Sequence, residues 1–247
     1  MKEPFDVYIG FDRREPEATL VARRSLLKTI SVGVRIHDLR EDELRSSGLY
    51  DRPFRIEGKQ RIDVRDGKPF STDFSFTRFL VPTLQDYRDW ALYCDSDFLF
   101  RSDLSDLLAL ADPSKAVMCV KHDYRPPERI KMDGQRQERY GRKNWSSLML
   151  WNCGHPANAA LRPEVVNFSS GAFLHGFQWL ADDLIGGLPE CWNWLEGWSP
   201  ATIEPRIVHM TRGIPTMAGY EDIPYADEWR AYLDGAAGGI FGERSLG

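Results

Sequence analysis

The chain has 247 residues, of which 42% are hydrophobic and 28% are charged, a composition typical of a globular protein with one substantial core. Its formal net charge of −5 argues against a nucleic-acid-binding protein, which needs a basic face. No stretch approaches the roughly 20 apolar residues of a membrane span, and Pro4 and Asp6 stand where a signal peptide would be apolar. We therefore expect a cytoplasmic protein, with peripheral membrane contact and oligomeric state left open.

The segment 5–39 predicts a βαβ unit. The run "FDVYIG" (5–10) is rich in residues that favour strands. A helix is expected from Pro16, which suits a first helical turn, and "VGVRIHDL" (32–39) is expected to be a second strand. Apolar residues recur at every fourth position of this helix, at Ala18, Ala22, Leu26 and Ile30. This order of elements indicates parallel strands.

Helices and strands continue to alternate after an irregular, polar stretch at 40–70. Helices are expected at 71–84, 102–111 (capped by Ser102 or Asp103), 155–161 and 171–185, and strands at 91–100, 115–121, 146–152 and 206–210. The pattern predicts an α/β fold with a mostly parallel central sheet flanked by helices, in a single domain over 1–247. The last 13 residues include five glycines, so we expect a loose tail from about residue 235.

The segment from Tyr124 to Lys143 differs from the rest of the chain. It holds seven Lys and Arg residues against three Asp and Glu residues, with little apolar periodicity. A loop of this length in a compact domain is unusual and is often functional. Two interpretations stay open: a solvated excursion, or a mobile cover over an anionic ligand.

The run "ALYCDSDFLF" (91–100) places Asp95 and Asp97 within a strongly apolar stretch. Buried carboxylates are costly unless positive charge meets them. Residues i and i+2 of an extended chain share one face, so both carboxylates can converge on one cation. Carboxylate oxygens suit Mg²⁺ or Mn²⁺, which commonly bridge a protein to substrate phosphates. The pattern therefore favours a metal site for a nucleotide-diphosphate substrate, although helix capping or a surface turn would also place aspartates here.

Three segments resemble glycosyltransferase family 8, the group that contains bacterial lipopolysaccharide α-galactosyl- and α-glucosyltransferases and glycogenin. The segment 74–107, "FSFTRFLVPTLQDYRDWALYCDSDFLFRSDLSDL", is similar to the family's helical arginine, strand, Asp-x-Asp and following helix. "YIGFD" (8–12) resembles its nucleotide-binding first strand, and "IVHMTRG" (207–213) its late His-x-x-Gly segment. The likeness spans about 5–215, and the central block is its specific part.

The resemblance implies a GT-A fold with a Rossmann-like nucleotide-binding half, and a metal-dependent glycosyltransferase. This enzyme would move a hexose from a UDP-sugar to a glycan or other hydroxyl acceptor, with retention of anomeric configuration. Mn²⁺ or Mg²⁺ would be held by Asp95, Asp97 and His209. Arg78 and Ser96 would contact the donor and Asp12 would lie near the nucleotide. An acidic segment near the family's acceptor site makes Asp182 and Asp183 the candidate catalytic residues, unless they form an exposed helical turn.

Two segments depart from the family pattern. The family has Asn-Ala-Gly or Asn-Ser-Gly where this chain has "NWSSLMLWN", so Ser147 stands in place of a glycine that lets backbone approach the sugar. The late histidine of the family is commonly followed by Lys-Pro-Trp, where this chain has "IPTM". Arg212 is a candidate to replace that lysine at the leaving diphosphate, because a guanidinium can clamp phosphate oxygens.

These departures keep other functions open. One alternative is a catalytically silent protein that binds a nucleotide sugar. Another is a sugar-phosphate nucleotidyltransferase, although "YIGFDRREPE" has only one glycine where that class has a glycine-rich loop. A haloacid-dehalogenase phosphatase fits poorly, because its Asp-x-Asp lies near the start of the chain. The sequence names neither the sugar nor the acceptor, nor whether a covalent intermediate forms.

Overall fold

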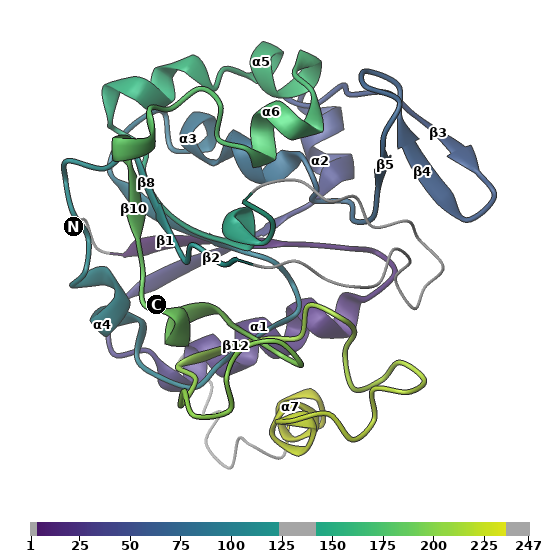
Figure 1. Ribbon diagram of the computed structural model, residues 1–247, viewed down its shortest axis with the longest axis vertical. Coiled ribbons are helices and arrows are strands. Elements are labelled where there is room, and N and C mark those ends of the chain that lie inside the picture. The colour runs from purple at the N-terminus through teal and green to yellow at the C-terminus, as the bar shows by residue number, and fades with distance from the viewer. Residues whose placement is uncertain (1–3, 124–141, 236–247) are drawn as a thin grey trace, which may run out of the picture.

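A six-stranded sheet forms the centre of the protein, and helices cover both of its faces (Figure 1). The computed structural model describes residues 4–123 and 142–235. The strand order is β10-β8-β9-β6-β1-β2. The strands are β1 (Phe5–Gly10), β2 (Val34–Leu39), β6 (Trp90–Cys94), β8 (Val117–Cys119), β9 (Leu148–Asn152) and β10 (Ile185–Gly187).

The sheet is mostly parallel, as the sequence predicts. β1 is parallel to both β2 and β6, and β8 is parallel to β10. β9 lies between β6 and β8 and is antiparallel to both. Every strand of this sheet except β9 therefore points the same way, and the carboxyl ends of β1, β6 and β8 meet at one edge. Ligands of α/β proteins bind at such an edge.

Helices pack on the sheet in two groups (Figure 1). One face carries α1 (Pro16–Thr29) and α4 (Leu104–Leu108). The other carries α2 (Glu41–Ser46), α3 (Val81–Leu84), α5 (Pro163–Phe168) and α6 (Gly171–His175). The 3₁₀ turns are η1 (Thr77–Leu80), η2 (Trp145–Ser147), η3 (Pro156–Ala160), η4 (Asp182–Leu184) and η5 (Glu190–Asn193).

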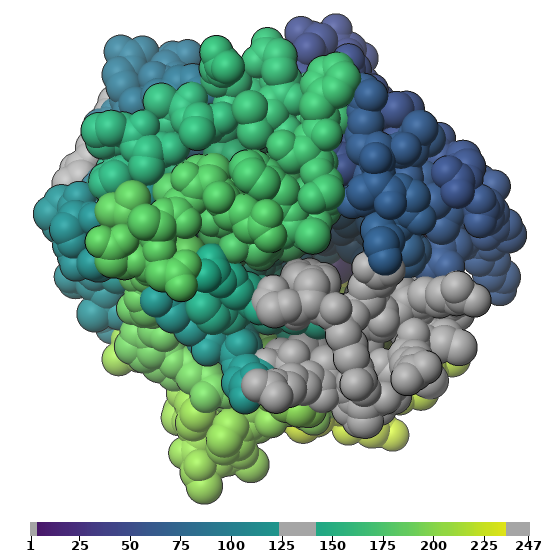
Figure 2. Space-filling model, turned by 45° about the horizontal axis from the view of Figure 1, so that its top comes forward, coloured from purple at the N-terminus to yellow at the C-terminus, as the bar shows by residue number. Residues whose placement is uncertain are grey.

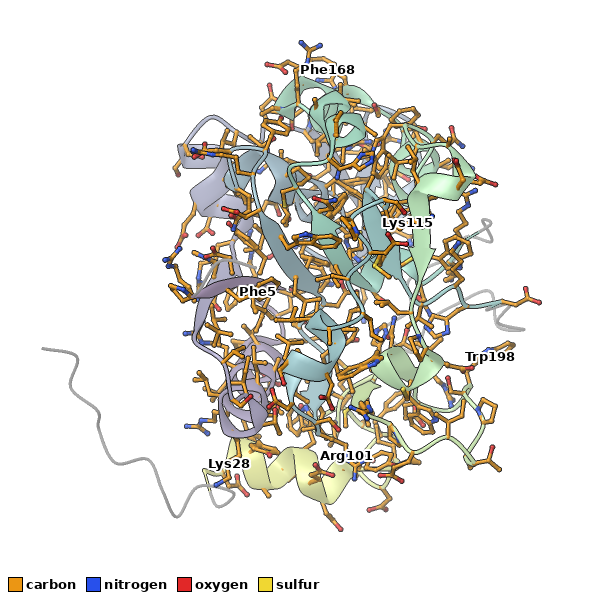
Figure 3. All side chains as sticks on the ribbon, turned by 90° about the vertical axis from the view of Figure 1, so that its left-hand side faces the viewer. Phe5, Lys28, Arg101, Lys115, Phe168 and Trp198 are labelled. Atoms are coloured by element: carbon orange, nitrogen blue, oxygen red, sulfur yellow. The ribbon has the colours of Figure 1, made fainter. Side chains whose placement is uncertain are left out.

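The central strands bury both of their faces, so two apolar layers form. Val7, Ile9 and Leu92 point into the layer beneath α1 and α4. Tyr8 and Tyr93, their neighbours in the chain, point into the opposite layer. This alternation follows from the two-residue period of a strand, and side chains fill the space on both sides of the sheet (Figure 3).

Two small sheets complete the fold. In the first, β12 (Ile207–His209) lies between β11 (Trp194–Leu195) and β7 (Phe98–Phe100), antiparallel to β7. It packs with α1 and with α7 (Ala226–Leu233) around a third apolar cluster that contains the fully buried Trp229. The second is an antiparallel sheet of β3 (Phe54–Glu57), β4 (Gln60–Asp63) and β5 (Pro69–Phe70).

Several local predictions are confirmed. The first strand spans 5–10 as expected, and α1 begins at Pro16. The side chain of Asp103 caps α4 by accepting a hydrogen bond from the Ser105 backbone. Within residues 4–123 and 142–235, no helix combines the length and the apolar character that crossing a bilayer requires.

Other local predictions are wrong. The expected helix at 71–84 is a short 3₁₀ turn followed by α3, and the expected helix at 171–185 stops at His175 because Phe177 adopts a left-handed φ of 53°. The stretch 40–70 is not irregular, since it contains α2 and the β3–β4 hairpin. The predicted cover at 124–143 and the predicted loose tail fall almost entirely outside the described residues.

A buried ion pair joins the β3–β4 hairpin to the body of the protein. The side chains of Arg52 and Asp63 are each 1% exposed, with Nη2 and Oδ2 2.5 Å apart. Nη1 of Arg52 also donates to the carbonyls of Val166 and Ser169, at 2.9 and 2.6 Å. The guanidinium therefore satisfies a buried carboxylate and two carbonyls at the end of α5 at once.

Replacing Arg52→Leu should therefore lower the free energy of unfolding by about 3–5 kcal/mol, because Asp63 would become an uncompensated buried charge. The matched control is Arg55→Leu, which breaks an ion pair whose side chains are 52% and 57% exposed. That change should cost less than about 1 kcal/mol. Urea unfolding measures both, and similar losses for the two variants would contradict the assignment.

Candidate functional site

A cleft with a volume of about 370 Å³ opens where β6 ends. It is lined by residues from six separate parts of the chain: 14–15, 66–78, 95–97, 143–147, 170–175 and 209–217. Figure 2 shows the face of the molecule on which the blue segment near residue 70 meets the green segment near residue 170. The cleft therefore depends on the tertiary fold rather than on one loop.

Asp95 directly follows β6, and its carboxylate forms an ion pair with the buried side chain of Arg78. Oδ1 lies 2.8 Å from Nη1 of Arg78 and accepts a 2.8 Å hydrogen bond from the hydroxyl of Tyr93. The Arg78 and Asp95 side chains are 7% and 14% exposed. Burial raises the pKa of Asp95, and the charge of Arg78 opposes that rise. Arg78 thus favours the ionised carboxylate.

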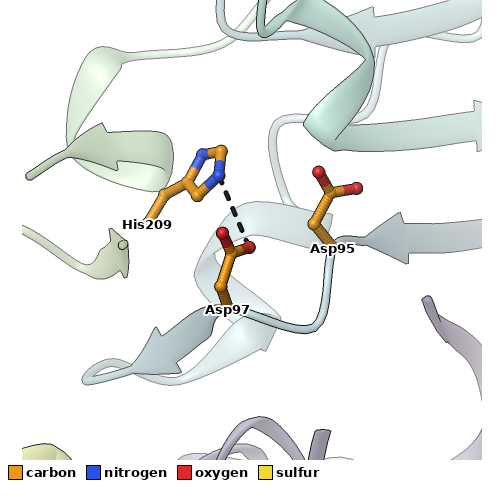
Figure 4. Close-up of side chains that lie close together, drawn as sticks. All are labelled: Asp95, Asp97 and His209. Atoms are coloured by element: carbon orange, nitrogen blue, oxygen red, sulfur yellow. Dashed lines mark ion pairs between the residues drawn. The ribbon is translucent and has the colours of Figure 1, made fainter. Parts of the chain in front are cut away.

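Strand β12 brings His209 to the two aspartates (Figure 4). His209 lies opposite Phe98 in the β12–β7 register, and its Nε2 is 3.5 Å from Oδ1 of Asp97. The imidazole stacks on the Phe98 ring with centroids 4.5 Å apart. Its Nδ1 lies 3.0 Å from Oδ1 of Asn193. The orientation of the ring is therefore fixed by a stacking contact and by a hydrogen bond.

The donor set of Asp95, Asp97 and His209 fits a divalent cation. Each residue offers one ligand atom, and the three atoms lie within 4.8 Å of one another. Two carboxylate oxygens and one imidazole nitrogen suit Mn²⁺, whereas Mg²⁺ prefers oxygen ligands alone. The structure thus brings together the three residues that the sequence predicts as metal ligands.

The residues predicted to contact the donor are Arg78, Ser96 and Arg212, and all three line the cleft. Arg78 donates to the carbonyl of Ser146 at 2.8 Å, so its guanidinium joins Asp95 to the 144–147 turn. Arg212 lies against Gly197, which has a φ of +70°. A Cβ at Gly197 would clash with the guanidinium and approach Cδ of Arg212 to 3.2 Å. The glycine therefore makes room for this arginine.

Asp12 is buried at 1% exposure and does not line the cleft. Its carboxylate accepts hydrogen bonds from Arg14 Nε and Nη2, at 2.9 and 2.6 Å, and from the backbone of Asp73. Arg14 itself lines the cleft. Asp12 is therefore placed to hold Arg14, and a direct contact with a nucleotide stays a prediction.

Asp182 and Asp183 lie on the exposed η4 turn and do not line the cleft. Asp182 forms an ion pair with Arg142, and its side chain is 84% exposed. The structure thus does not bring these two carboxylates to the Asp95–Asp97–His209 cluster, and their catalytic role stays a prediction.

Several residues in or next to the cleft escape sequence reasoning. Lys143 is 8% exposed and lines the cleft beside Asn144. The hydroxyl of Ser146 lies 2.8 Å from Nδ1 of the half-buried His175, a histidine without ligand-like spacing in the sequence. Asn193, which supports His209, follows a tryptophan in an apolar stretch and carries no recognisable signal. Only the contacts between distant segments identify these residues.

Comparison with known proteins places the chain in a family. No protein-family model matches it. Protein CDI of Arabidopsis thaliana is 46% identical over 233 residues, which cover 92% of this chain and 85% of Protein CDI. The chain belongs to the Protein CDI family.

Solved structures show which fold this member of the CDI family has. The bifunctional glycosyltransferase WbbM matches with a TM-score of 0.61 at 12% identity, and the match covers 94% of this chain and 50% of WbbM. The glycosyltransferase GlyE of Streptococcus pneumoniae matches with a TM-score of 0.57 at 15% identity, over 93% of this chain and 60% of GlyE. The galactosyltransferase LgtC matches with a TM-score of 0.55 at 12% identity, over 94% of this chain and 96% of LgtC. The predicted GT-A fold is thereby confirmed.

The half-buried His175 of this CDI-family protein should make its stability depend on pH. Burial lowers the pKa of His175 to about 3, whereas the unfolded histidine titrates near 6.5. Below pH 6.5 the unfolded chain binds a proton that the folded chain does not, so stability falls as the pH falls towards 3. The stability advantage of the wild type over His175→Gln should shrink by up to about 1.4 kcal/mol per pH unit in this window.

Urea unfolding at several pH values measures this effect. Ser146→Ala is the control, because it removes the hydrogen bond to His175 but keeps the ionisable ring. It should lower stability without changing the pH slope. Parallel curves for the wild type and His175→Gln would contradict the assignment.

Proposed function

We propose that this protein is a metal-dependent glycosyltransferase that transfers a hexose from a UDP-sugar to a hydroxyl of a glycan or other acceptor, with retention of anomeric configuration. The observation that carries the proposal is the convergence of Asp95, Asp97 and His209 in a cleft at the carboxyl end of β6. LgtC, which shares the fold, is a galactosyltransferase that was solved with donor and acceptor sugar analogues.

The three ligands would hold Mn²⁺, or less readily Mg²⁺, next to the donor diphosphate. When bound, the ion offsets the negative charge that develops on the departing diphosphate. Asp97 and Asp95 supply two negative charges, so a divalent ion also removes their mutual repulsion. His209 would bind through a neutral nitrogen, which favours Mn²⁺.

The cleft itself is suited to an anionic donor. Arg14, Lys68, Lys143 and Arg212 line it in addition to Arg78, whose charge is engaged by Asp95. Arg212 follows His209 by three residues, and both line the cleft. A guanidinium there can donate to the phosphate oxygens that the metal leaves exposed.

The transfer forms a bond between the acceptor oxygen and the anomeric carbon and breaks the bond from that carbon to the diphosphate. Retention requires both bonds to lie on the same face of the sugar. The acceptor proton must reach a base, and the departing diphosphate oxygen is one on that face. Asp182 and Asp183 would act on an acceptor only if it extended to the η4 surface.

The proposed activity is tested by incubating the protein with Mn²⁺ and a panel of nucleotide sugars and following donor hydrolysis and the anomer released by NMR. We expect slow release of the retained anomer from one UDP-sugar. Asp97→Asn should abolish turnover, because it removes a charged ligand. His209→Ala should need much higher Mn²⁺ and retain some activity.

The control variant is Asp86→Asn, which alters a carboxylate that is 78% exposed on a turn and should behave as wild type. Nucleotide binding without turnover would favour the silent binding protein. Release of pyrophosphate from UTP and a sugar 1-phosphate would favour the nucleotidyltransferase. Equal UDP affinity with Mn²⁺ and with chelator would remove the metal from the proposal.

The role of Arg212 can be tested by a substitution at its neighbour Gly197, which leaves the arginine itself in the chain. Gly197→Ala should displace the guanidinium and weaken UDP binding by about 10- to 100-fold, the equivalent of a lost charge-assisted hydrogen bond. Gly58→Ala is the matched control, because Gly58 has a similar φ of +61° but no atom within 4 Å of the added Cβ. Both variants should lose about 1–2 kcal/mol of stability from backbone strain. Calorimetry with equal UDP affinities for the two would contradict the role of Arg212.

A further inference from the structure

A chain of buried hydrogen bonds leads from His209 to the turn at 144–147. Nδ1 of His209 lies 3.0 Å from Oδ1 of Asn193, and Nδ2 of Asn193 lies 3.0 Å from the hydroxyl of Ser147. That hydroxyl in turn lies 2.7 Å from the carbonyl of Asn144. Asn193 is fully buried, and Ser147 and His209 are each 2% exposed.

The direction of this chain is set by its last member. The carbonyl of Asn144 can only accept a hydrogen bond, so Ser147 must donate its single proton there. The Ser147 oxygen is then left with lone pairs, and it accepts from the amide nitrogen of Asn193. A flipped Asn193 would set its own oxygen against those lone pairs and lose the bond. The amide oxygen of Asn193 therefore faces the imidazole.

This orientation decides where the proton of His209 lies. The amide oxygen of Asn193 only accepts, so Nδ1 of His209 must carry the proton. In a neutral imidazole the other nitrogen, Nε2, then holds the lone pair. Nε2 is the atom that lies 3.5 Å from Asp97. The nitrogen that faces the aspartate is thus the one able to bind a cation.

We infer that Asn193 and Ser147 are positioning residues that hold His209 in the tautomer with its lone pair on Nε2, preorganised for the metal. The metal in this inference is that of the proposed function. Ligating histidines commonly depend on such a partner, whose loss lowers metal affinity by about 10- to 100-fold. The inference also gives Ser147 a role at the position where the family has glycine. Its hydroxyl orients Asn193, which in turn orients His209.

The local fold explains how these residues meet. Asn193 ends η5 directly before β11, which pairs with β12 so that Leu195 lies opposite His209. Ser147 ends η2 directly before β9, and its carbonyl accepts a 2.9 Å hydrogen bond from the backbone of Asp95. Ser147 is therefore tied to Asp95 through its backbone and to His209 through its side chain.

The tautomer is read directly by two-bond ¹H–¹⁵N NMR of the metal-free, full-length protein. The chain has five histidines, so the His209 signals are assigned by their loss in His209→Ala. We expect a protonated Nδ1 and a bare Nε2 in the wild type. Asn193→Leu, which keeps the volume but neither hydrogen bond, should populate both tautomers. A wild-type His209 with its proton on Nε2 would overturn the inference.

Metal binding supplies the second readout, measured as free Mn²⁺ by electron paramagnetic resonance without nucleotide. Asn193→Leu should bind Mn²⁺ about 10- to 100-fold more weakly, and Ser147→Ala should lie between it and the wild type. Asn193→Asp should restore affinity, because a carboxylate still accepts from Nδ1. Asn158→Leu is the matched control: Asn158 is equally buried but bonds the carbonyls of Ala116 and Asn152, outside the cleft.

The outcomes separate this inference from the proposed function. Unchanged Mn²⁺ affinity in Asn193→Leu, or an equal loss in Asn158→Leu, would overturn the positioning role. If Asn193→Leu does not fold, Ser147→Ala and Asn193→Asp carry the same test. The expected tautomer in a wild type that binds no Mn²⁺ would support the hydrogen-bond assignment and reject the metal of the proposed function.

Discussion

Two carboxylates at the end of a buried strand are stable only where positive charge or hydrogen-bond donors reach them, and this requirement organises the cleft. Arg78 comes from η1, 17 positions before Asp95 in the chain, and its guanidinium also holds the carbonyl of Ser146. Tyr93 donates to the same carboxylate oxygen from within β6. The contacts that stabilise the carboxylate of Asp95 therefore fix β6, η1 and the turn before β9 relative to one another.

The second aspartate is placed by a change of sheet. β6 ends at Cys94, and the chain then enters β7, which belongs to the sheet that contains β12. The break between the sheets leaves 95–97 at the cleft, with Asp95 supported from the central sheet and Asp97 facing His209 from the smaller one. A continuous strand through 91–100 would have buried these side chains in a layer of the core. Asp95, Asp97 and His209 come together because the apolar run 91–100 is interrupted between β6 and β7.

The sequence predicts those parts of the fold that depend on local chemistry. β1, the start of α1 at Pro16 and the cap at Asp103 follow from residue preferences that act over a few positions. The failures lie where distant contacts decide. The polar hairpin of β3 and β4 is held by the Arg52–Asp63 pair, which links it to α5 more than 100 positions away. Asp95 and Asp97 were predictable as a motif and His209 from the family resemblance, but Asn193 and Ser147 acquire their roles only through tertiary contacts.

Asn193 and Ser147, which orient His209, help to decide between a catalytic protein and one that only binds a nucleotide sugar. A buried asparagine and a buried serine are costly unless their polar groups are satisfied, and apolar residues of similar size would serve the core equally well. Here both are satisfied in one directed chain that ends at the nitrogen opposite a predicted metal-binding atom. If the cleft bound a nucleotide sugar only through its lysine and arginine side chains, binding would not require the proton of His209 to lie on a particular nitrogen. The two departures from the family pattern therefore weigh less against catalysis than they do in the sequence alone. Ser147 is linked to His209 through Asn193, and Gly197 leaves room for Arg212.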